Sequence, residues 1–105
     1  MKHHDPQHVQ ANRAARSNLA EAFLAMKTAE EMHALIKDLT TPAELEALVD
    51  RWRVVKLLDE GRPYREINEL TGVSVTTIGR VARFLEYGNG GYRLALERLK
   101  GENHE

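Results

Sequence analysis

The fold is decided by the stretch RPYREINELTGVSVTTIGRVARFLE, residues 62–86. Pro63 starts a helical pattern that stops at Gly72, where a tight turn needs a residue that tolerates a positive φ. Ser74 can then cap a second helix. Apolar side chains recur on the inner faces of both helices and inside the turn, at Ile67, Leu70, Val73, Ile78, Val81 and Leu85, with Tyr64 adding cover. This spacing predicts a helix-turn-helix at residues 63–86.

The outward face of the second helix, residues 74–86, suits the major groove of DNA. Its side chains are small, hydroxylated or basic, so methyl groups can meet thymine and polar groups can meet base edges. Arg62 and Arg65 flank the start of the preceding helix and, with Arg83, are the expected phosphate contacts. The complete set of predicted DNA-binding residues is Arg62, Arg65, Ser74, Val75, Thr76, Thr77, Gly79, Arg80 and Arg83.

The charge distribution agrees with this interpretation, although the net charge is only −1. Residues 51–100 carry ten Lys and Arg against six Asp and Glu, whereas residues 1–50 carry five against eight. The basic half therefore contains the predicted reading head, where phosphates would be contacted. The acidic first half keeps an alternative open, a homodimeric helical protein-interaction module without DNA binding.

Several classes of protein are disfavoured by composition. The chain has no cysteine, so disulfides, zinc–thiolate sites and a cysteine nucleophile are excluded. No apolar run approaches the roughly 20 residues that span a bilayer, and no signal peptide is recognisable, so we expect a cytoplasmic protein with no membrane partner. The five histidines lie at 3, 4, 8, 33 and 104, mostly near the ends, and no catalytic constellation or metal motif stands out. We expect neither an enzyme nor a metal site.

The rest of the chain also predicts helices, and no alternating strand pattern occurs, so the fold class is all-α. Residues 1–16 lack helical periodicity and are expected to form a flexible arm, with the helical domain covering 17–100 and a flexible tail at 101–105. Ser17, Thr28 and Thr41 are the predicted N-caps of three helices, the second with a capping box to Glu31. After residue 86, a glycine-rich turn leads into a final packing helix.

The helix that starts after Thr41 is predicted to end at Gly61 and is apolar on more than one stripe. It carries Leu45, Leu48, Val49, Trp52, Val54, Val55, Leu57 and Leu58. A central core helix would explain this pattern. A second copy of the chain that covers the helix explains it better, because the neighbouring helices are short and amphipathic.

Several fragments together resemble the Trp repressor superfamily. They are TPAELEAL at 41–48, RWRVV at 51–55, VTTIGR at 75–80 and, closer to its YerC/YecD-like branch, YGNGGYRLALER at 87–98. The resemblance implies about six helices, an intertwined homodimer with two reading heads facing adjacent major grooves of double-stranded DNA, and a repressor that regulates transcription.

The resemblance also implies a pocket for a small effector such as L-tryptophan. Arg51 and Arg80 fall where two arginines of the tryptophan-binding members enclose the indole, and Thr41 falls near the polar end of the ligand. Val81 stands where the repressor has a glycine, and its branched side chain argues against tryptophan because a close apolar clash is costly to relieve. We therefore expect no obligatory cofactor.

Overall fold

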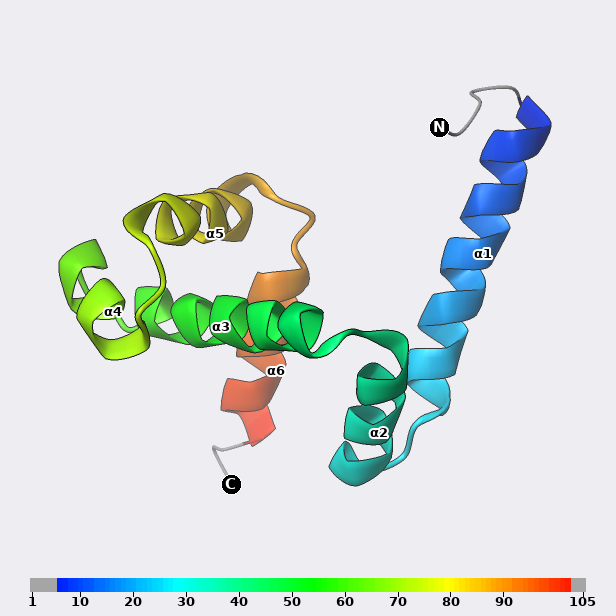
Figure 1. Cartoon of the computed structure of the whole chain (residues 1–105), viewed down its shortest axis with the longest axis horizontal. Helices are drawn as coiled ribbons and strands as arrows, with labels where there is room; N and C mark the ends of the chain where they lie inside the picture. The colour runs from blue at the N-terminus through cyan, green and yellow to red at the C-terminus, as the bar shows by residue number, and fades with distance from the viewer. Residues whose placement is uncertain (1–5, 103–105) are drawn as a thin grey trace. The chain divides into compact units, whose positions relative to one another are not determined.

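The computed structural model describes residues 6–102 of the chain, which form six α-helices and no β-strand (Figure 1). The all-α class predicted from the sequence is confirmed. The chain divides into two compact units, one ending at Pro42 and the other beginning at Ala43. Within the described range, no helix is both long and apolar enough to cross a bilayer. The helices are α1 Pro6–Ala25, α2 Ala29–Leu39, α3 Pro42–Asp59, α4 Tyr64–Thr71, α5 Val75–Tyr87 and α6 Gly91–Glu102.

The first helix, α1, begins at Pro6, so the predicted start with Ser17 as N-cap is wrong. The expected arm without helical structure is also wrong for residues 6–16, while residues 1–5 lie outside the described part. Proline suits the first turn of a helix, and the alanines, glutamines and arginines that follow have high intrinsic helix propensity. No residue of α1 is buried, so residues 6–16 need no apolar stripe and show none in the sequence. The intrinsic helix propensity of these residues therefore accounts for this part of α1, without help from a periodic apolar face.

The capping box predicted for α2 is confirmed in a shifted form. The Thr28 Oγ1 atom accepts a hydrogen bond from the Glu31 N–H at 3.0 Å. The Glu31 carboxylate reaches back to the N–H of Lys27, one residue before the cap, with a donor–acceptor distance of 2.7 Å. At the other end, the Thr40 hydroxyl donates to the Ile36 carbonyl at 2.7 Å. Both ends of α2 are thus satisfied locally, although α2 has no buried residue.

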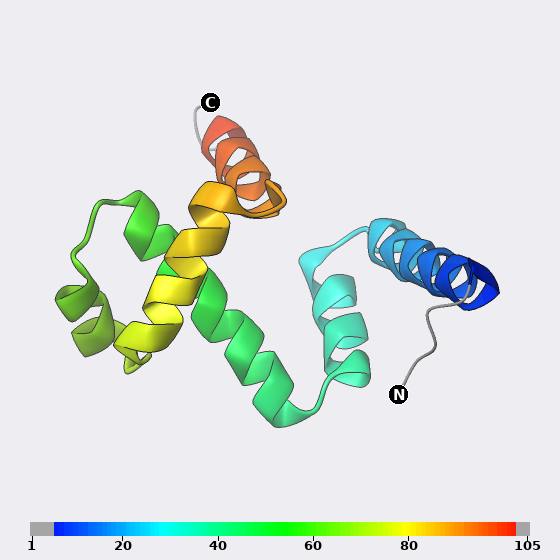
Figure 2. The same cartoon turned by 90° about the horizontal axis from the view of Figure 1, so that it is seen from above.

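The core of the second unit lies where α3, α4, α5 and α6 meet. Figure 2 shows α5 crossing α3 obliquely, with α4 at the N-terminal end of α5 and α6 at its C-terminal end. The buried residues are Val54, Val55, Ile67, Val73, Ile78, Val81 and Leu96. Burial of these side chains is the main source of stability for a unit of this size.

The apolar residues of α3 are not all covered. Val54 and Val55 are fully buried, whereas Leu48 and Val49, on the N-terminal half, are about half exposed. Gly61 has a φ of 81° just after the end of α3, as expected of a residue that stops a helix. An ion pair of 2.7 Å between Lys100 Nζ and Asp59 Oδ2 joins α6 to this end of α3. Since α6 extends to Glu102, the tail predicted at 101–105 begins too early, and residues 103–105 lie outside the described part.

Candidate nucleic-acid interface

The turn between α4 and α5 is built by local hydrogen bonds. Gly72 ends α4 with a φ of 74°, as predicted. The Thr71 hydroxyl donates to the Ile67 carbonyl at 2.7 Å and accepts from the Val73 N–H at 3.0 Å. The Asn68 side-chain amide donates to the Val73 carbonyl at 2.8 Å. Both backbone groups of buried Val73 are thereby satisfied, which fixes the course of the chain from one helix to the next.

Sequence reasoning missed the two side chains that hold this turn, Asn68 and Thr71. A usable signal was present, because Asn and Thr near the end of a helix often bond to nearby backbone groups. The predicted inner face is confirmed at Ile67, Ile78 and Val81, but Leu70 is 52% exposed. A two-turn helix offers only a narrow strip to the core, and a residue three positions after Ile67 is turned about 60° away from it.

The N-terminus of α5 is capped by Ser74, as predicted. Its Oγ accepts from the Thr77 N–H at 3.2 Å and donates to the Thr77 hydroxyl at 3.1 Å. This capping engages both hydroxyl groups and anchors the first turn. Val75 and Thr76, which lie between them in the sequence, are exposed. The first turn of α5 therefore offers a methyl-rich side chain and a hydroxyl group to solvent.

Two arginines farther along α5 are available for an anionic ligand. Arg80 and Arg83 are exposed, and neither forms an ion pair within residues 6–102. Arg65 on α4 is 92% exposed, and its Nε lies 4.0 Å from Glu69 Oε1, the outer limit of an ion pair. Such a pair at the surface contributes little to stability and is easily exchanged for a phosphate.

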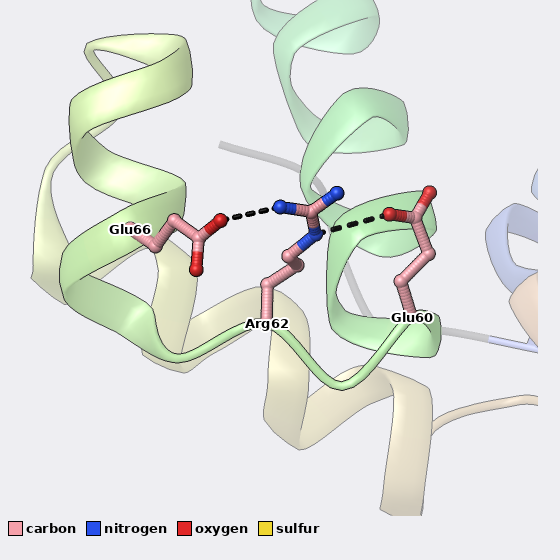
Figure 3. Close-up of polar contacts among 3 residues, drawn as sticks. All are labelled: Glu60, Arg62 and Glu66. Atoms are coloured by element: carbon pink, nitrogen blue, oxygen red, sulfur yellow. Dashed lines mark hydrogen bonds and ion pairs between the residues drawn. The ribbon is translucent and has the colours of Figure 1, made fainter.

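Arg62 differs from the other predicted phosphate contacts because its guanidinium is already engaged. It lies in the loop between α3 and α4, where it pairs with Glu66 of α4 and with Glu60, whose Oε1 is 3.2 Å from its Nε (Figure 3). The hydrogen bond with Glu66, followed by that with Glu60, raises the pKa of Arg62 above its ordinary value. The loop thus joins the end of α3 to the start of α4 through one side chain.

The structure brings together two of the three residues predicted to line an effector pocket. Arg51 of α3 and Arg80 of α5 both line a hollow of about 360 Å³. Thr41, the third, belongs to the first unit. Val81 contributes to the wall while it also belongs to the core. Phe84 and Tyr92 complete the lining with Thr77, and sequence reasoning missed these two aromatic residues. Phe84 stands one helical turn after Arg80, a spacing that could have identified it.

Comparison with known proteins places this geometry in a family. A family model described as Trp repressor protein matches residues 15–100. The chain belongs to the Trp repressor family. Its members are helix-turn-helix regulators rather than enzymes, and α4, the turn and α5 form a helix-turn-helix in this chain.

Two relatives support this assignment. The chain is 42% identical over 82 residues to YerC, an uncharacterized protein of Bacillus subtilis (strain 168), covering 78% of this chain and 79% of YerC. It superimposes with a TM-score of 0.79 on a TrpR-like protein from Eubacterium eligens ATCC 27750. That similarity has 41% sequence identity and covers 83% of this chain and 90% of the other. The resemblance to the YerC-like branch of the superfamily is therefore confirmed.

Proposed function

We propose that this Trp repressor family protein is a sequence-specific regulator of transcription, a repressor that reads the major groove with α5. One observation carries the proposal. The face of α5 that points away from the core has small exposed residues at its start and, farther on, two arginines that form no ion pair with residues 6–102. A helix with such a face can approach base edges closely, while its cations neutralise phosphates.

The residues of this face divide into two roles in the proposed complex. Val75 and Thr76 meet base edges, because the N-terminal part of a recognition helix enters the groove most deeply. Arg65 and Arg83 contact phosphates, which position the protein without carrying sequence information. Ser74 and Thr77 hold the start of α5 through their mutual hydrogen bonds and meet DNA through what remains of their polar groups.

We further propose a homodimer with two reading heads. The first unit has no buried residue in either of its helices. Its large apolar side chains are left open to solvent: Leu24 is 84% exposed, and Leu19 and Leu39 are about half exposed. The uncovered half of α3 adds Leu48 and Val49. Helices that bury nothing within their own chain are marginal in water, so a second copy of the chain is the partner that fits. Two-fold symmetry then requires half-sites about one helical turn of DNA apart.

A small effector is compatible with the hollow between Arg51 and Arg80. Two guanidinium groups favour a carboxylate, while Phe84 and Tyr92 offer aromatic surface. Arg80 also belongs to the proposed reading face, so a ligand there would alter the cation that DNA meets. Calorimetric titration of the full chain with L-tryptophan tests this part. We expect no binding heat from tryptophan, because the Val81 side chain occupies space beside the ring position.

The DNA-binding proposal is tested by titrating labelled duplexes, selected from a random pool, at several salt concentrations. We expect selected duplexes to share a pseudo-palindrome and affinity to fall linearly on a log–log plot against salt. Absence of any binding at low salt would refute the proposal. Selection with and without tryptophan in the same experiment reports whether an effector is required.

A further inference from the structure

Gly79 lies in the middle of α5, where neither backbone conformation nor packing within the chain requires a glycine. Its φ is not among the positive values of the glycines described, so no special backbone conformation requires it. A Cβ atom at this position would meet nothing within 4 Å, so no close packing inside the chain requires it either. Glycine in a helix interior is destabilising relative to alanine. The small size of Gly79 is therefore useful only for a contact with something outside the chain.

A hollow of about 360 Å³ opens at Gly79. It is lined by Tyr64, Gly79, Ala82, Arg83, Glu86 and Tyr87. Gly79 and Ala82 are its two small lining residues, both from α5. Tyr64 at the start of α4 and Tyr87 at the end of α5 are both exposed, Tyr87 by 80%. The hollow thus combines two phenol groups with a guanidinium that forms no ion pair with residues 6–102, next to a glycine whose Cβ would meet open space.

We propose that this hollow, the Gly79 seat, holds a phosphate of the DNA backbone. The Arg83 guanidinium supplies the charged donors, and the hydroxyls of Tyr64 and Tyr87 supply neutral ones. The absence of a Cβ at Gly79 lets the sugar–phosphate backbone approach the helix closely. The inference rests on the proposed function, and it adds two tyrosines to the residues expected from the sequence.

A phosphate fits the seat better than a base edge. Base edges are met mainly by the first turns of a recognition helix, whereas Ala82, Arg83 and Tyr87 belong to its second half. Arginine and tyrosine are common donors to phosphate oxygens. Glu86 is the one acidic residue of the lining, and its carboxylate opposes a phosphate. Glu86 therefore lowers the affinity of the Gly79 seat for a phosphate, and removal of this charge is expected to tighten binding.

The decisive variant is Gly79→Ala, measured in the full chain for both thermal stability and duplex affinity. We expect the melting temperature to rise by about 2–6 °C, because alanine favours the helix. We expect duplex affinity to fall at least about fivefold, because a methyl group intrudes on the phosphate. Gly101→Ala is the matched control, since Gly101 is also helical and its Cβ would also meet open space. It should leave duplex affinity unchanged.

The tyrosines and charges give an independent test on the same duplex. Tyr64→Phe and Tyr87→Phe should each weaken binding about three- to tenfold without changing the salt slope, because each removes a neutral hydrogen bond. Arg83→Gln should reduce the salt slope by about 0.9, the value for one phosphate contact. Glu86→Gln should strengthen binding. Each variant should change affinity by the same factor for every duplex sequence, because the contact is to the backbone.

The outcomes separate the seat from the function on which it rests. Wild-type protein that binds no duplex at low salt would refute the proposed function. Wild-type protein that binds duplex, together with a Gly79→Ala variant of equal affinity, would overturn the seat alone. A Gly79→Ala variant with a changed base preference would also overturn it, because the hollow would then hold a base edge.

Discussion

The rings of Trp52 and Tyr92 lie against each other, with centroids 6.4 Å apart and planes inclined by 47°. Trp52 belongs to α3 and Tyr92 to α6, and both are half-buried at the edge of the core. Tilted aromatic pairs at this separation are favourable. Tyr92 also lines the hollow between Arg51 and Arg80, so this contact connects the packing of α6 to the candidate effector pocket.

Replacing Tyr92 by leucine should destabilise the second unit by about 1 kcal/mol, because the aromatic pairing is lost while apolar volume is largely kept. Trp52 is the only tryptophan of the chain, so its fluorescence reports this change directly. Urea unfolding followed by Trp52 emission and by circular dichroism measures the midpoint. Tyr87→Leu is the control, since Tyr87 is exposed and should leave the midpoint nearly unchanged. Equal midpoints for both variants would contradict the role of the pair.

Replacing Thr71 by valine should destabilise the turn of the helix-turn-helix by about 1–3 kcal/mol. The valine side chain has nearly the same shape, but the Val73 N–H loses its acceptor in a partly buried place. Thr76→Val provides the comparison, because Thr76 is exposed. Chemical denaturation gives both values. A cost for Thr71→Val no larger than that for Thr76→Val would show that the hydroxyl bridge is not needed.

Replacing Gly88 by alanine should destabilise the chain by roughly 1–3 kcal/mol, the usual cost of local backbone strain. A Cβ at Gly88 would lie 2.3 Å from the carbonyl oxygen of Phe84, so the backbone at the end of α5 would have to shift. Gly91→Ala in the same turn region is the control, because its Cβ would meet nothing within 4 Å. The melting temperatures of the two variants check this, and equal values would contradict the steric argument.

Much of the helix-turn-helix was predictable because its determinants are local. The period of the apolar residues, the positive φ at Gly72 and the cap at Ser74 depend on neighbours a few positions away. The same logic failed for α1, where helix propensity acts without an apolar stripe, and for Leu70, where the short length of α4 decides exposure. Local patterns also identified the arginines near the reading head, but they did not show which carboxylates pair with them.

The site was less predictable than the fold, because it depends on contacts between segments distant in sequence. The hollow beside Arg80 needs Tyr92 from α6, and the Gly79 seat needs Tyr64 from α4. Neither tyrosine has a periodic signal that relates it to α5. Such neighbours follow from how the helices pack, which depends on the whole core rather than on any one motif.

The proposed homodimer predicts that stability depends on protein concentration. Leu48→Lys and Val49→Lys should each lower the melting temperature and shift the mass in solution towards that of one chain, because a charge would be buried in the interface. Asn89→Lys, in the exposed turn before α6, adds the same charge in a segment that the dimer proposal does not use and is the control. Sedimentation velocity over a range of concentrations gives the masses. A wild-type mass of one chain at all concentrations would exclude the dimer.

The engaged state of Arg62 predicts that it behaves unlike the other arginines of the reading head. Arg65→Gln and Arg83→Gln should each reduce the slope of log affinity against log salt by about 0.9, because each removes one phosphate contact. Arg62→Gln should leave the slope unchanged, because its guanidinium is bound to Glu60 and Glu66 rather than open to phosphate.

Affinity of the Arg62→Gln variant should still fall modestly, since the pairing joins the end of α3 to the start of α4. Arg62→Lys, which keeps the charge but not the planar fork, should restore only part of that loss. Should Arg62→Gln lower the slope as much as Arg83→Gln, Arg62 must leave its carboxylates to bind DNA.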